Sequence, residues 1–463
     1  MNLFPDAMSF SLLPLYEALH SDPRLVPALR RIETRHGGEL YCVGGCIRDS
    51  LLNRPVTDID LVVGSDAMGC ARMLAEAVKG AFVPLDVDED VGRVVFHRRM
   101  TFDFASFKGQ TLDEDLARRD FTINAMAYRF SDVLEQSSSL IDPQGGVADL
   151  ENKRITAVSE QAFPDDPLRM LRAYRFAAQL DFLIDRDTHV WITRWTQRLP
   201  EVSKERVQDE LAVLLTQSRS VPWLREMSRS GVLSAVLPDL SQQHSFLSLK
   251  YVERILEAPA STQISGLDRL VSPRRLSNRD WTWLLRLAAL LIDHRSPHHR
   301  SEEWITTIAT VWLRLSNREQ RVLLSFIQMP VRLKTLIVES NVTDDALYGI
   351  SLHSAEDTGG VILLTLALCQ TDGIDGSTYL PPLNRLIEFD KRCRAVQSGP
   401  RLVTGNDLMT HFDLPPGPRL GVLLERLQME QVTGGIRTRE AALAAVESWL
   451  TSVKLNGKKT PGK

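Results

Sequence analysis

Short runs of alternating hydrophobic and polar residues dominate the first third of the chain. Between residues 39 and 128 these runs are rich in β-branched and aromatic side chains, and turn-forming or helical segments separate them. A period of two residues is typical of strands with one buried face. We therefore expect strands at residues 40–43, 59–63, 81–85, 91–97 and 100–105.

One helical segment stands out among these runs. Cys70, Leu74 and Val78 recur every four residues, which places them on one face of a helix. Ser65 is a suitable cap at the beginning of this helix, and Gly80 is a natural stop. We expect the helix to pack on the sheet and to form a small α/β domain with it.

Beyond about residue 150 the alternation fades, and apolar residues such as Leu168 and Leu171 recur at intervals of three and four. This period is typical of amphipathic helices, so we expect an α+β protein whose remainder is almost wholly helical. Glycine, proline and serine cluster where we expect breaks, at residues 142–146, 238–243 and 372–382.

These breaks predict four domains. They are a head at residues 1–150, a helical neck at 151–240, a helical body at 241–380 and a helical tail at 381–463. The chain of 463 residues is long enough for several cores. Its end, from residue 455 on, combines lysines with glycine and proline, and we expect it to be disordered.

Composition narrows the class of protein. Charged residues make up 25% of the chain, and no apolar run approaches the roughly 18 residues of a transmembrane helix, so we expect no membrane contact. No secretory signal is recognisable, and the five cysteines lack metal-ligand spacing, which predicts reduced thiols in the cytoplasm. Because the formal net charge is −4, any affinity for nucleic acid has to come from local groups of Arg and Lys.

A candidate phosphate-binding segment follows the first predicted strand, where Gly44 and Gly45 precede Arg48 and Asp49. Paired glycines let backbone amides approach phosphate oxygens, and a helix beginning there directs its positive end and Arg48 to the same anion. The pattern is that of a triphosphate site. Alternatively, the glycines merely permit a turn.

Asp58 and Asp60 begin the second predicted strand. Because they are two residues apart, both side chains project from one face, unless they only flank a turn. Carboxylate oxygens suit Mg²⁺, and a two-metal site can activate a hydroxyl and neutralise a leaving pyrophosphate. Asp103, between two phenylalanines on a later strand, is either a third carboxylate of this site or an exposed residue of a half-buried strand.

Together these motifs resemble the nucleotidyltransferase superfamily of polymerase beta, and within it the class II branch of CCA-adding enzymes and bacterial poly(A) polymerases. Residues 118–126 are similar to the second motif of that branch, and residues 165–169 to its nucleotide-selecting motif. The resemblance implies a polymerase-beta-type head with a mixed sheet and Mg²⁺ as cofactor. It also implies template-independent addition of CMP or AMP, from CTP and ATP, to the 3′ end of tRNA with release of pyrophosphate.

The resemblance also implies roles for individual residues. Arg119, Asp120 and Asn124 would hold the ribose and triphosphate of the incoming nucleotide. Its base would be selected by Asp166 and Arg169, with Asp165 in support. Arg172 and Arg175 follow on the same helical run and are further nucleotide-binding candidates. An Asp offers acceptors and an Arg a rigid donor fork, which together match cytosine or adenine. The family usually has Glu at the position of Asp165, and the shorter side chain affects how it supports the pair.

Residues 203–211 resemble the family's fifth motif. Arg206 and Glu210 are four residues apart there, so we expect them to pair on one helix face as a structural brace. In the family this segment supports the nucleotide site.

Many relatives have a phosphohydrolase domain in the body, recognised by a metal-binding His-Asp pair. Ile292 stands at the position of that histidine, followed by Asp293 and His294. We therefore expect a hydrolase-like body without a working metal centre, with these residues at a solvated helix end. In the tail, residues 404–408 and 415–421 resemble a helical element of longer bacterial members.

The extent of addition stays open. Only residues 104–111 separate Asp103 from the next motif, whereas CCA-adding relatives often have a longer loop there. Its loss is associated in the family with enzymes that add two cytidines and stop, because a short connection has less reach to reorient the selecting pair. A bacterial poly(A) polymerase and a catalytically silent RNA-binding protein are the alternatives, and the oligomeric state is not predicted.

Overall fold

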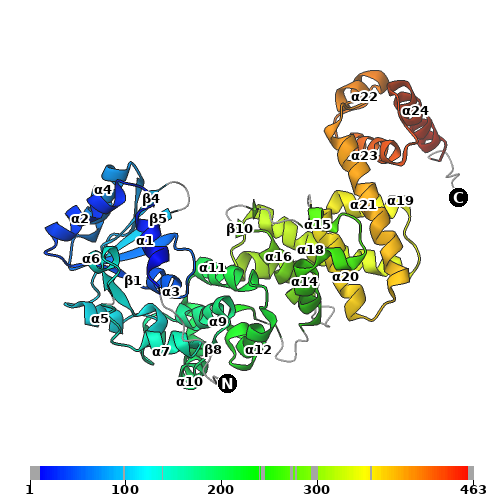
Figure 1. Ribbon diagram of the computed structural model, residues 1–463. Helices are drawn as coiled ribbons and strands as arrows, with labels where there is room; N and C mark the ends of the chain where they lie inside the picture. Colours follow the sequence, from blue (N-terminus) through cyan, green and yellow to red (C-terminus); the bar gives the residue numbers. More distant parts are fainter. Residues whose placement is uncertain are drawn as a thin grey trace. The chain divides into compact units, whose positions relative to one another are not determined.

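The computed structural model in Figure 1 describes most of the chain. The described residues are 11–96, 100–137, 139–238, 240, 246–271, 275–276, 279–292, 301–354 and 357–456. The contacts within the chain divide it into two compact units, Met1–Asp239 and Leu240–Lys463. Among the described helices, none is both long enough and apolar enough to cross a membrane.

The first unit is built on a six-stranded mixed sheet. Its strands are β1 (Leu40–Val43), β2 (Asp58–Val63), β3 (Ala81–Asp86), β4 (Val91–Phe96), β5 (Met100–Ser106) and β6 (Ala127–Arg129). They lie in the order β3-β4-β5-β2-β1-β6, in which β2 and β5 are parallel and the other neighbours antiparallel. The five predicted strands and the α+β class are confirmed, although His97, the expected end of the fourth strand, lies outside the described residues.

One face of this sheet is covered by α4 (Ala67–Val78), which packs on β3, β4 and β5 and is itself covered by α2 (Leu25–Arg35) (Figure 1). Gly92 shows which face this is, because a Cβ atom there would meet Ala71 of α4 at 3.1 Å. The residues spaced four apart are buried on this helix as expected: Cys70, Leu74 and Val78. The opposite face of the sheet therefore carries the side chains of Asp60 and Asp103.

The beginning of α4 differs from the expectation. Ser65 does not cap this helix. Instead, the carboxylate of Asp90, from the turn between β3 and β4, accepts hydrogen bonds from the amides of Ala67 and Met68 at 2.7 and 3.0 Å. A long-range acceptor thus replaces the local one, because Asp66 adopts a left-handed conformation (φ 59°) before the helix.

The predicted break at residues 142–146 is confirmed and has a defined geometry. Asp142 accepts hydrogen bonds from the amides of Gly146 and Val147 at 2.7 and 2.9 Å, which begins α7 (Gly146–Glu151). A short parallel pair follows, β7 (Arg154–Ile155) with β8 (Leu183–Ile184). The sequence did not predict this pair, since two residues are too few to show a period.

The neck consists of helices around α9 (Leu168–Leu180), which is preceded by the single turn α8 (Ala162–Asp165). Against α9 pack α11 (Lys204–Leu215) and α12 (Val221–Arg229). The apolar side of α9 is buried, including Leu168 and Leu171. Its polar side faces the candidate site.

The second unit is predominantly helical, as expected. Its described core contains α14 (Leu247–Glu257), α16 (Thr282–Ile292), α18 (Asn317–Val338) and α20 (Thr358–Thr371). Ile292 ends α16 fully buried. Asp293 and His294, for which a solvated helix end was predicted, lie outside the described residues, as do part of the predicted break at 238–243 and the terminal lysines.

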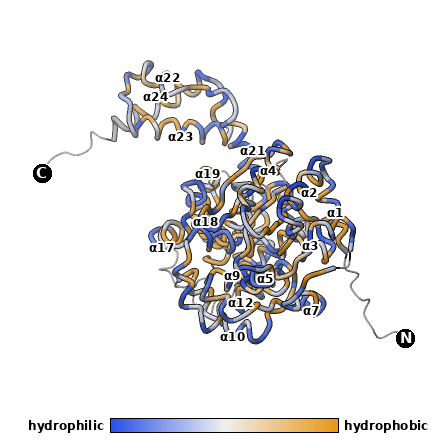
Figure 2. The backbone as a smooth tube through the Cα atoms, turned by 90° about the vertical axis from the view of Figure 1, so that its left-hand side faces the viewer, coloured by the Kyte–Doolittle hydropathy of each residue, from blue (hydrophilic) through white to orange (hydrophobic). Residues whose placement is uncertain are grey.

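The helix α21 (Gly376–Ser398) leads from this core to the tail, formed by α22 (Gly405–Phe412), α23 (Pro418–Thr433) and α24 (Arg439–Asn456). Pro381 and Pro382 lie inside α21, so the predicted break at 372–382 is shorter than expected. Figure 2 shows hydrophobic and hydrophilic stretches alternating along α23 and α24. The apolar sides of α22, α23 and α24 form a small separate core around Leu408, Leu423, Leu427 and Val446.

Candidate active site

Gly44 lies directly after β1 and before α3 (Gly45–Leu51), with a left-handed φ of 72°. A Cβ atom at this position would lie 3.0 Å from Nη1 of Arg119 and 3.2 Å from a carboxylate oxygen of Asp60. Glycine is therefore required both by the backbone conformation and by the close approach of two charged side chains. The chain turns tightly here beside the carboxylates.

The three predicted carboxylates lie on adjacent parallel strands. The register pairs Asp60 with Asp103 and Asp58 with Thr101, so all three acidic side chains share one face of the sheet. The hydroxyl of Thr101 donates a hydrogen bond to Asp58 at 2.5 Å. On the other side of β5, Arg93 of β4 donates from Nε and Nη2 to both oxygens of Asp103, at 2.7 and 2.6 Å.

Asp60 is the electrostatic centre of this group. Burial raises its pKa to about 6; Arg119 opposes this shift, and the neighbouring carboxylates of Asp103 and Asp58 add to it. A buried carboxylate with two acidic neighbours is stabilised by any cation that binds beside it. The site therefore favours a divalent cation.

The donors fit such an ion. Mg²⁺ is commonly held by one or two carboxylates, with substrate phosphates and water as its remaining ligands. Asp58 and Asp60 are suitable as the two carboxylates of such a site. In the described part of the chain, no group of three or more His, Cys, Asp or Glu side chains could hold a metal ion by itself. At this site the substrate would therefore have to supply further ligands.

Arg48, Asp49 and Asn124 form a hydrogen-bonded chain behind the glycine turn. The buried guanidinium of Arg48 donates to both oxygens of Asp49, at 2.9 and 2.8 Å, and to the amide oxygen of Asn124 at 2.6 Å. Asn124 in turn donates to Asp120 at 3.0 Å. These residues brace one another, and direct contact with a nucleotide stays a prediction for them.

Asp120 is buried and fully bonded. It accepts hydrogen bonds from the amide of Phe121 at 2.8 Å and from Nε and Nη2 of Arg172 at 2.9 and 2.7 Å. Burial alone would raise the pKa of Asp120, but the charge of Arg172 and these hydrogen bonds lower it to about 2. The second motif is thereby tied to α9.

A pocket of about 260 Å³ opens beside this network. It is lined by Ala105, Ser106, Lys108, Asp115, Arg118, Arg119, Asp120, Asp166, Arg169 and Arg172. Ala105 is two residues beyond Asp103 on the same strand, so the pocket adjoins the carboxylates. Its many Arg side chains suit a polyphosphate ligand.

The two predicted base-selecting side chains are held in the wall of this pocket. Asp166 accepts a hydrogen bond from the amide of Leu168 at 3.2 Å and one from Nη2 of Arg206 at 2.8 Å. Arg169 donates to the carbonyl oxygens of Arg118 and Arg119, at 2.9 and 3.3 Å. Both side chains are thus fixed before any nucleotide binds.

The brace expected between Arg206 and Glu210 does not form. Arg206 pairs with Asp166, whereas Glu210 pairs with Arg172 and Arg175 of α9. Neighbouring helices supply better partners than the same helix, because the side chains of α11 face α9. Arg175 is consequently engaged with Glu210 and does not line the pocket.

Asp165 also lies apart from the pocket, at the end of α8, where it accepts a hydrogen bond from Gln161 at 2.7 Å. Lys108, Arg118 and Asp115 also line the pocket and were not predicted from the sequence. Asp115 is buried and accepts hydrogen bonds from Arg119, at 3.1 and 2.9 Å. The i,i+4 spacing of this pair was the available signal.

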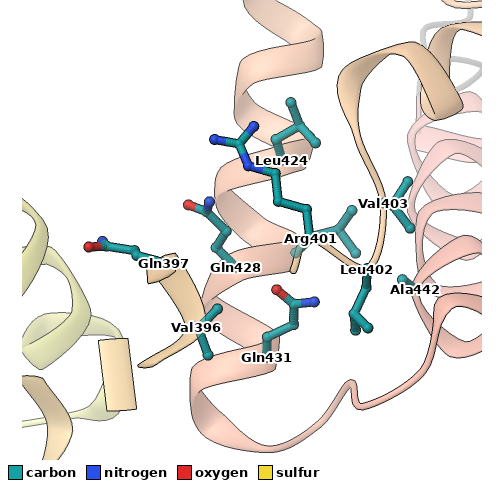
Figure 3. Close-up of a pocket in the computed structure, with 10 residues that line it drawn as sticks. Val396, Gln397, Arg401, Leu402, Val403, Leu424, Gln428, Gln431 and Ala442 are labelled. Atoms are coloured by element: carbon teal, nitrogen blue, oxygen red, sulfur yellow. The ribbon is translucent and has the colours of Figure 1, made fainter. Parts of the chain in front are cut away.

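A second, smaller pocket of about 30 Å³ lies in the tail, where the end of α21 meets α23 and α24 (Figure 3). Its polar lining consists of Gln397, Arg401, Gln428 and Gln431, and it contains no carboxylate or histidine. It is therefore no candidate active site.

A mixed sheet that carries paired carboxylates on one strand and a third on the next, beside an arginine-rich pocket, has the groups that a nucleotidyltransferase needs. The matching families are described as "Poly A polymerase head domain" (residues 40–156), "Probable RNA and SrmB- binding site of polymerase A" (181–243) and "tRNA nucleotidyltransferase domain 2 putative" (391–446). The chain is 35% identical to a CC-adding tRNA nucleotidyltransferase of Geobacter sulfurreducens, over 90% of this chain and 94% of the relative.

Further relatives are a CC-adding tRNA nucleotidyltransferase of Synechocystis sp., 32% identical over 87% of this chain and 91% of the relative, and an A-adding one of Deinococcus radiodurans, 29% identical over 88% and 94%. A CCA-adding enzyme solved with ATP shares the fold, with a TM-score of 0.66 at 21% identity over 96% of this chain and 97% of the other. A Thermotoga maritima CCA-adding enzyme complexed with tRNA does so with a TM-score of 0.63 at 21% identity, over 94% and 98%. The chain belongs to the tRNA nucleotidyltransferase family.

Proposed function

We propose that this protein adds nucleotides to the 3′ end of tRNA without a nucleic-acid template, using CTP, ATP or both. The observation that carries the proposal is the adjacency of Asp58, Asp60 and Asp103 to the pocket that holds Asp166 and Arg169. The first group suits transfer of a nucleotidyl group, and the second suits recognition of a base. The names of the relatives support tRNA as the acceptor.

In the proposed reaction the terminal 3′-hydroxyl of the tRNA attacks the α-phosphorus of the nucleotide. A new P–O bond forms, the bond between the α- and β-phosphates breaks, and pyrophosphate leaves. Asp103 accepts the hydroxyl proton, and Arg119 faces the phosphates from the pocket wall. Mg²⁺ held by Asp58 and Asp60 would supply activation of the hydroxyl and neutralisation of the leaving group.

Base selection rests on Asp166 and Arg169. The Asp166 carboxylate accepts from the exocyclic amine of cytosine or adenine, and the Arg169 fork donates to the adjacent ring nitrogen. Uracil and guanine present the opposite pattern on the same edge, so they would leave these groups unpaired. Protein side chains thus take the place of a template strand.

The favoured specificity is addition of two cytidines. Residues Phe104–Ser106 belong to β5, so only residues 107–111 connect this strand to α5 (Leu112–Ala117). This connection is short, and two relatives at 32–35% identity bear the name CC-adding. Full CCA addition is the second candidate, since CCA-adding enzymes are also relatives, at 27% identity over 90% of this chain.

The experiment supplies a tRNA that lacks its three terminal nucleotides, with Mg²⁺ and with CTP, ATP or both. A product longer by two nucleotides with CTP, unchanged by ATP, is the expected result. A third nucleotide with both substrates would replace the CC-adding proposal by CCA addition. Long adenosine tracts would reject tRNA end synthesis altogether, and unchanged activity of Asp58→Ala would reject the catalytic assignment.

The cellular location is proposed to be the cytoplasm. All five cysteines are buried free thiols, which supports a reducing compartment. Cell fractionation that placed the protein in an oxidising compartment would contradict this.

A further inference from the structure

The face of β3, β4 and β5 opposite α4 carries a strip of side chains that none of the proposed steps uses. The strand register forms two rows of paired residues that run from β2 across β5 and β4 to β3. One row consists of Asp60, Asp103, Arg93 and Val83. The other consists of Asp58, Thr101, Val95 and Ala81. Paired residues point to the same face of a sheet. Arg93, Val83, Val95 and Ala81 are called the outer strip below.

The outer strip is accessible, although it lies on the body of the sheet. Val83 is 39% exposed and the side chain of Arg93 is 40% exposed. Alternate residues on the same strands, such as Val94 and Phe102, are fully buried on the α4 side. An accessible apolar surface beside a charged site offers a place for an apolar part of a ligand.

The outer strip and the nucleotide pocket extend in different directions from Asp103. The pocket begins at Ala105, two residues after Asp103 along β5, whereas the outer strip extends across the sheet from Asp103 and Thr101 to β4 and β3. In phosphoryl transfer the attacking and leaving oxygens are roughly in line, on opposite sides of the phosphorus. If the triphosphate occupies the pocket, the outer strip is left for the RNA end that brings the attacking hydroxyl.

Arg93 has the chemistry to receive a nucleotide phosphate there. Its Nε and Nη2 are used by Asp103, but Nη1 donates to no acceptor among the residues that the structure describes. The hydrogen bonds to Asp103 raise the pKa of Arg93, so its charge is retained. A guanidinium fixed by one carboxylate is a preorganised donor for a phosphate oxygen.

From this arrangement we infer that the outer strip seats the last nucleotide of the RNA that is being extended. The Nη1 group of Arg93 binds the phosphate of that nucleotide, and its base lies on Val83 and Val95. The contact is apolar and therefore tolerates different bases, which a growing end requires. The inference rests on the proposed function, since it assumes that a tRNA end is the acceptor.

The test is steady-state kinetics with tRNA that lacks its terminal nucleotides, in which the KM for tRNA and the KM for CTP are measured separately. In Arg93→Ala the KM for tRNA is expected to rise about tenfold, the value of one lost charged hydrogen bond, while the KM for CTP changes less than twofold. A lower kcat accompanies it, because Asp103 loses its partner. A fall in kcat with an unchanged KM for tRNA would overturn the inference.

Val83→Glu provides a second test that leaves Asp103 and Arg93 in place. Because residue 83 lies opposite Arg93, the new carboxylate both attracts the Arg93 guanidinium and repels the RNA phosphate. The KM for tRNA is therefore expected to rise at least fivefold, on the order of 1 kcal/mol of lost binding. Val87→Glu is the matched control, since Val87 is 67% exposed in the turn after β3 and outside the paired rows. Equal effects of the two changes would overturn the inference.

A failure of the inference about the outer strip is distinguishable from a failure of the proposed function. If the unmodified protein extends no tRNA, the proposed function fails. If it extends tRNA but Arg93→Ala and Val83→Glu leave the KM for tRNA unchanged, only the binding of the RNA end to the outer strip is rejected. Cooperative thermal unfolding of each variant checks that the protein is folded, and Val83→Glu carries the test alone if Arg93→Ala does not fold.

Discussion

The two sides of the carboxylate group are built differently. On the pocket side, Asp166 and Arg169 are held by Arg206 and by backbone carbonyls, and Asp120 has every oxygen bonded. On the outer strip, the side chains are apolar except for Arg93. A rigid set of donors and acceptors can discriminate between bases, whereas an apolar surface accepts any of them. We therefore expect the incoming base to be selected on the pocket side, and the outer strip to accept any base at the RNA end.

The largest effect is expected for the group that both sides share. Asp60→Asn removes a ligand charge at the centre of the site, so kcat with CTP and tRNA should fall on the order of 10³-fold. The fold should persist, because burial already disfavours the charged form of Asp60. Single-turnover kinetics measures the loss, and retention of more than a tenth of the rate would contradict the role of this carboxylate.

Selection of the incoming base should depend only on the residues of the pocket side. Arg169→Ala breaks the two-point contact that Asp166 and Arg169 make together with the base, so the ratio of kcat/KM for CTP to that for UTP should fall about 10- to 100-fold. The KM for tRNA should stay within twofold, which is the opposite of the result expected for Arg93→Ala. Preserved discrimination would place base selection elsewhere.

A smaller effect is expected for Arg206, which reaches the nucleotide only through Asp166. Arg206→Ala should lower the same discrimination ratio about fivefold, since Asp166 keeps its hydrogen bond from the amide of Leu168. Arg206→Lys, which retains the charge, should recover part of it. An effect of Arg206→Ala as large as that of Arg169→Ala would indicate that Arg206 contacts the base itself.

Acid should reduce the contribution of Asp120 to the stability of the fold over a defined pH range. The pKa of Asp120 is about 2 in the folded protein, below its usual value, so the charged form stabilises the fold above about pH 4 and this contribution is lost as the pH falls towards 2. Urea unfolding at pH 7, 5 and 3 should therefore show Asp120→Asn to be less stable than the unmodified protein at pH 7. The difference should shrink at pH 3; a constant difference would contradict the assignment.

Local sequence patterns predicted the parts of the site that depend on spacing. The period of two predicted the strands, and the interval between Asp58 and Asp60 placed both side chains on one face, as the structure confirms. The partners that fix these groups were not predictable in this way. Arg93 with Asp103, Arg206 with Asp166 and Asp90 with α4 join residues that are far apart in sequence, and only the folded chain brings them together.

The same reason explains why the predicted partners of Ser65 and Glu210 were wrong. Ser65 and Glu210 were assigned to neighbours along the chain, because spacing is the only information that a single sequence gives. In the fold, an oxygen of Asp90 and the guanidinium groups of α9 lie closer and bind instead. Tertiary partners override local ones wherever elements pack tightly.

The division of the site into a nucleotide side and an RNA side is tested most directly by photo-crosslinking of the full-length protein. One sample receives tRNA whose last nucleotide carries a photoreactive base, and the other a photoreactive CTP analogue. Mass spectrometry is expected to find the tRNA label on peptides that contain Val83 or Val95 and the CTP label on peptides that contain Asp166 or Arg169. If both labels fall on the same peptides, the carboxylates do not separate two binding surfaces and the account is wrong.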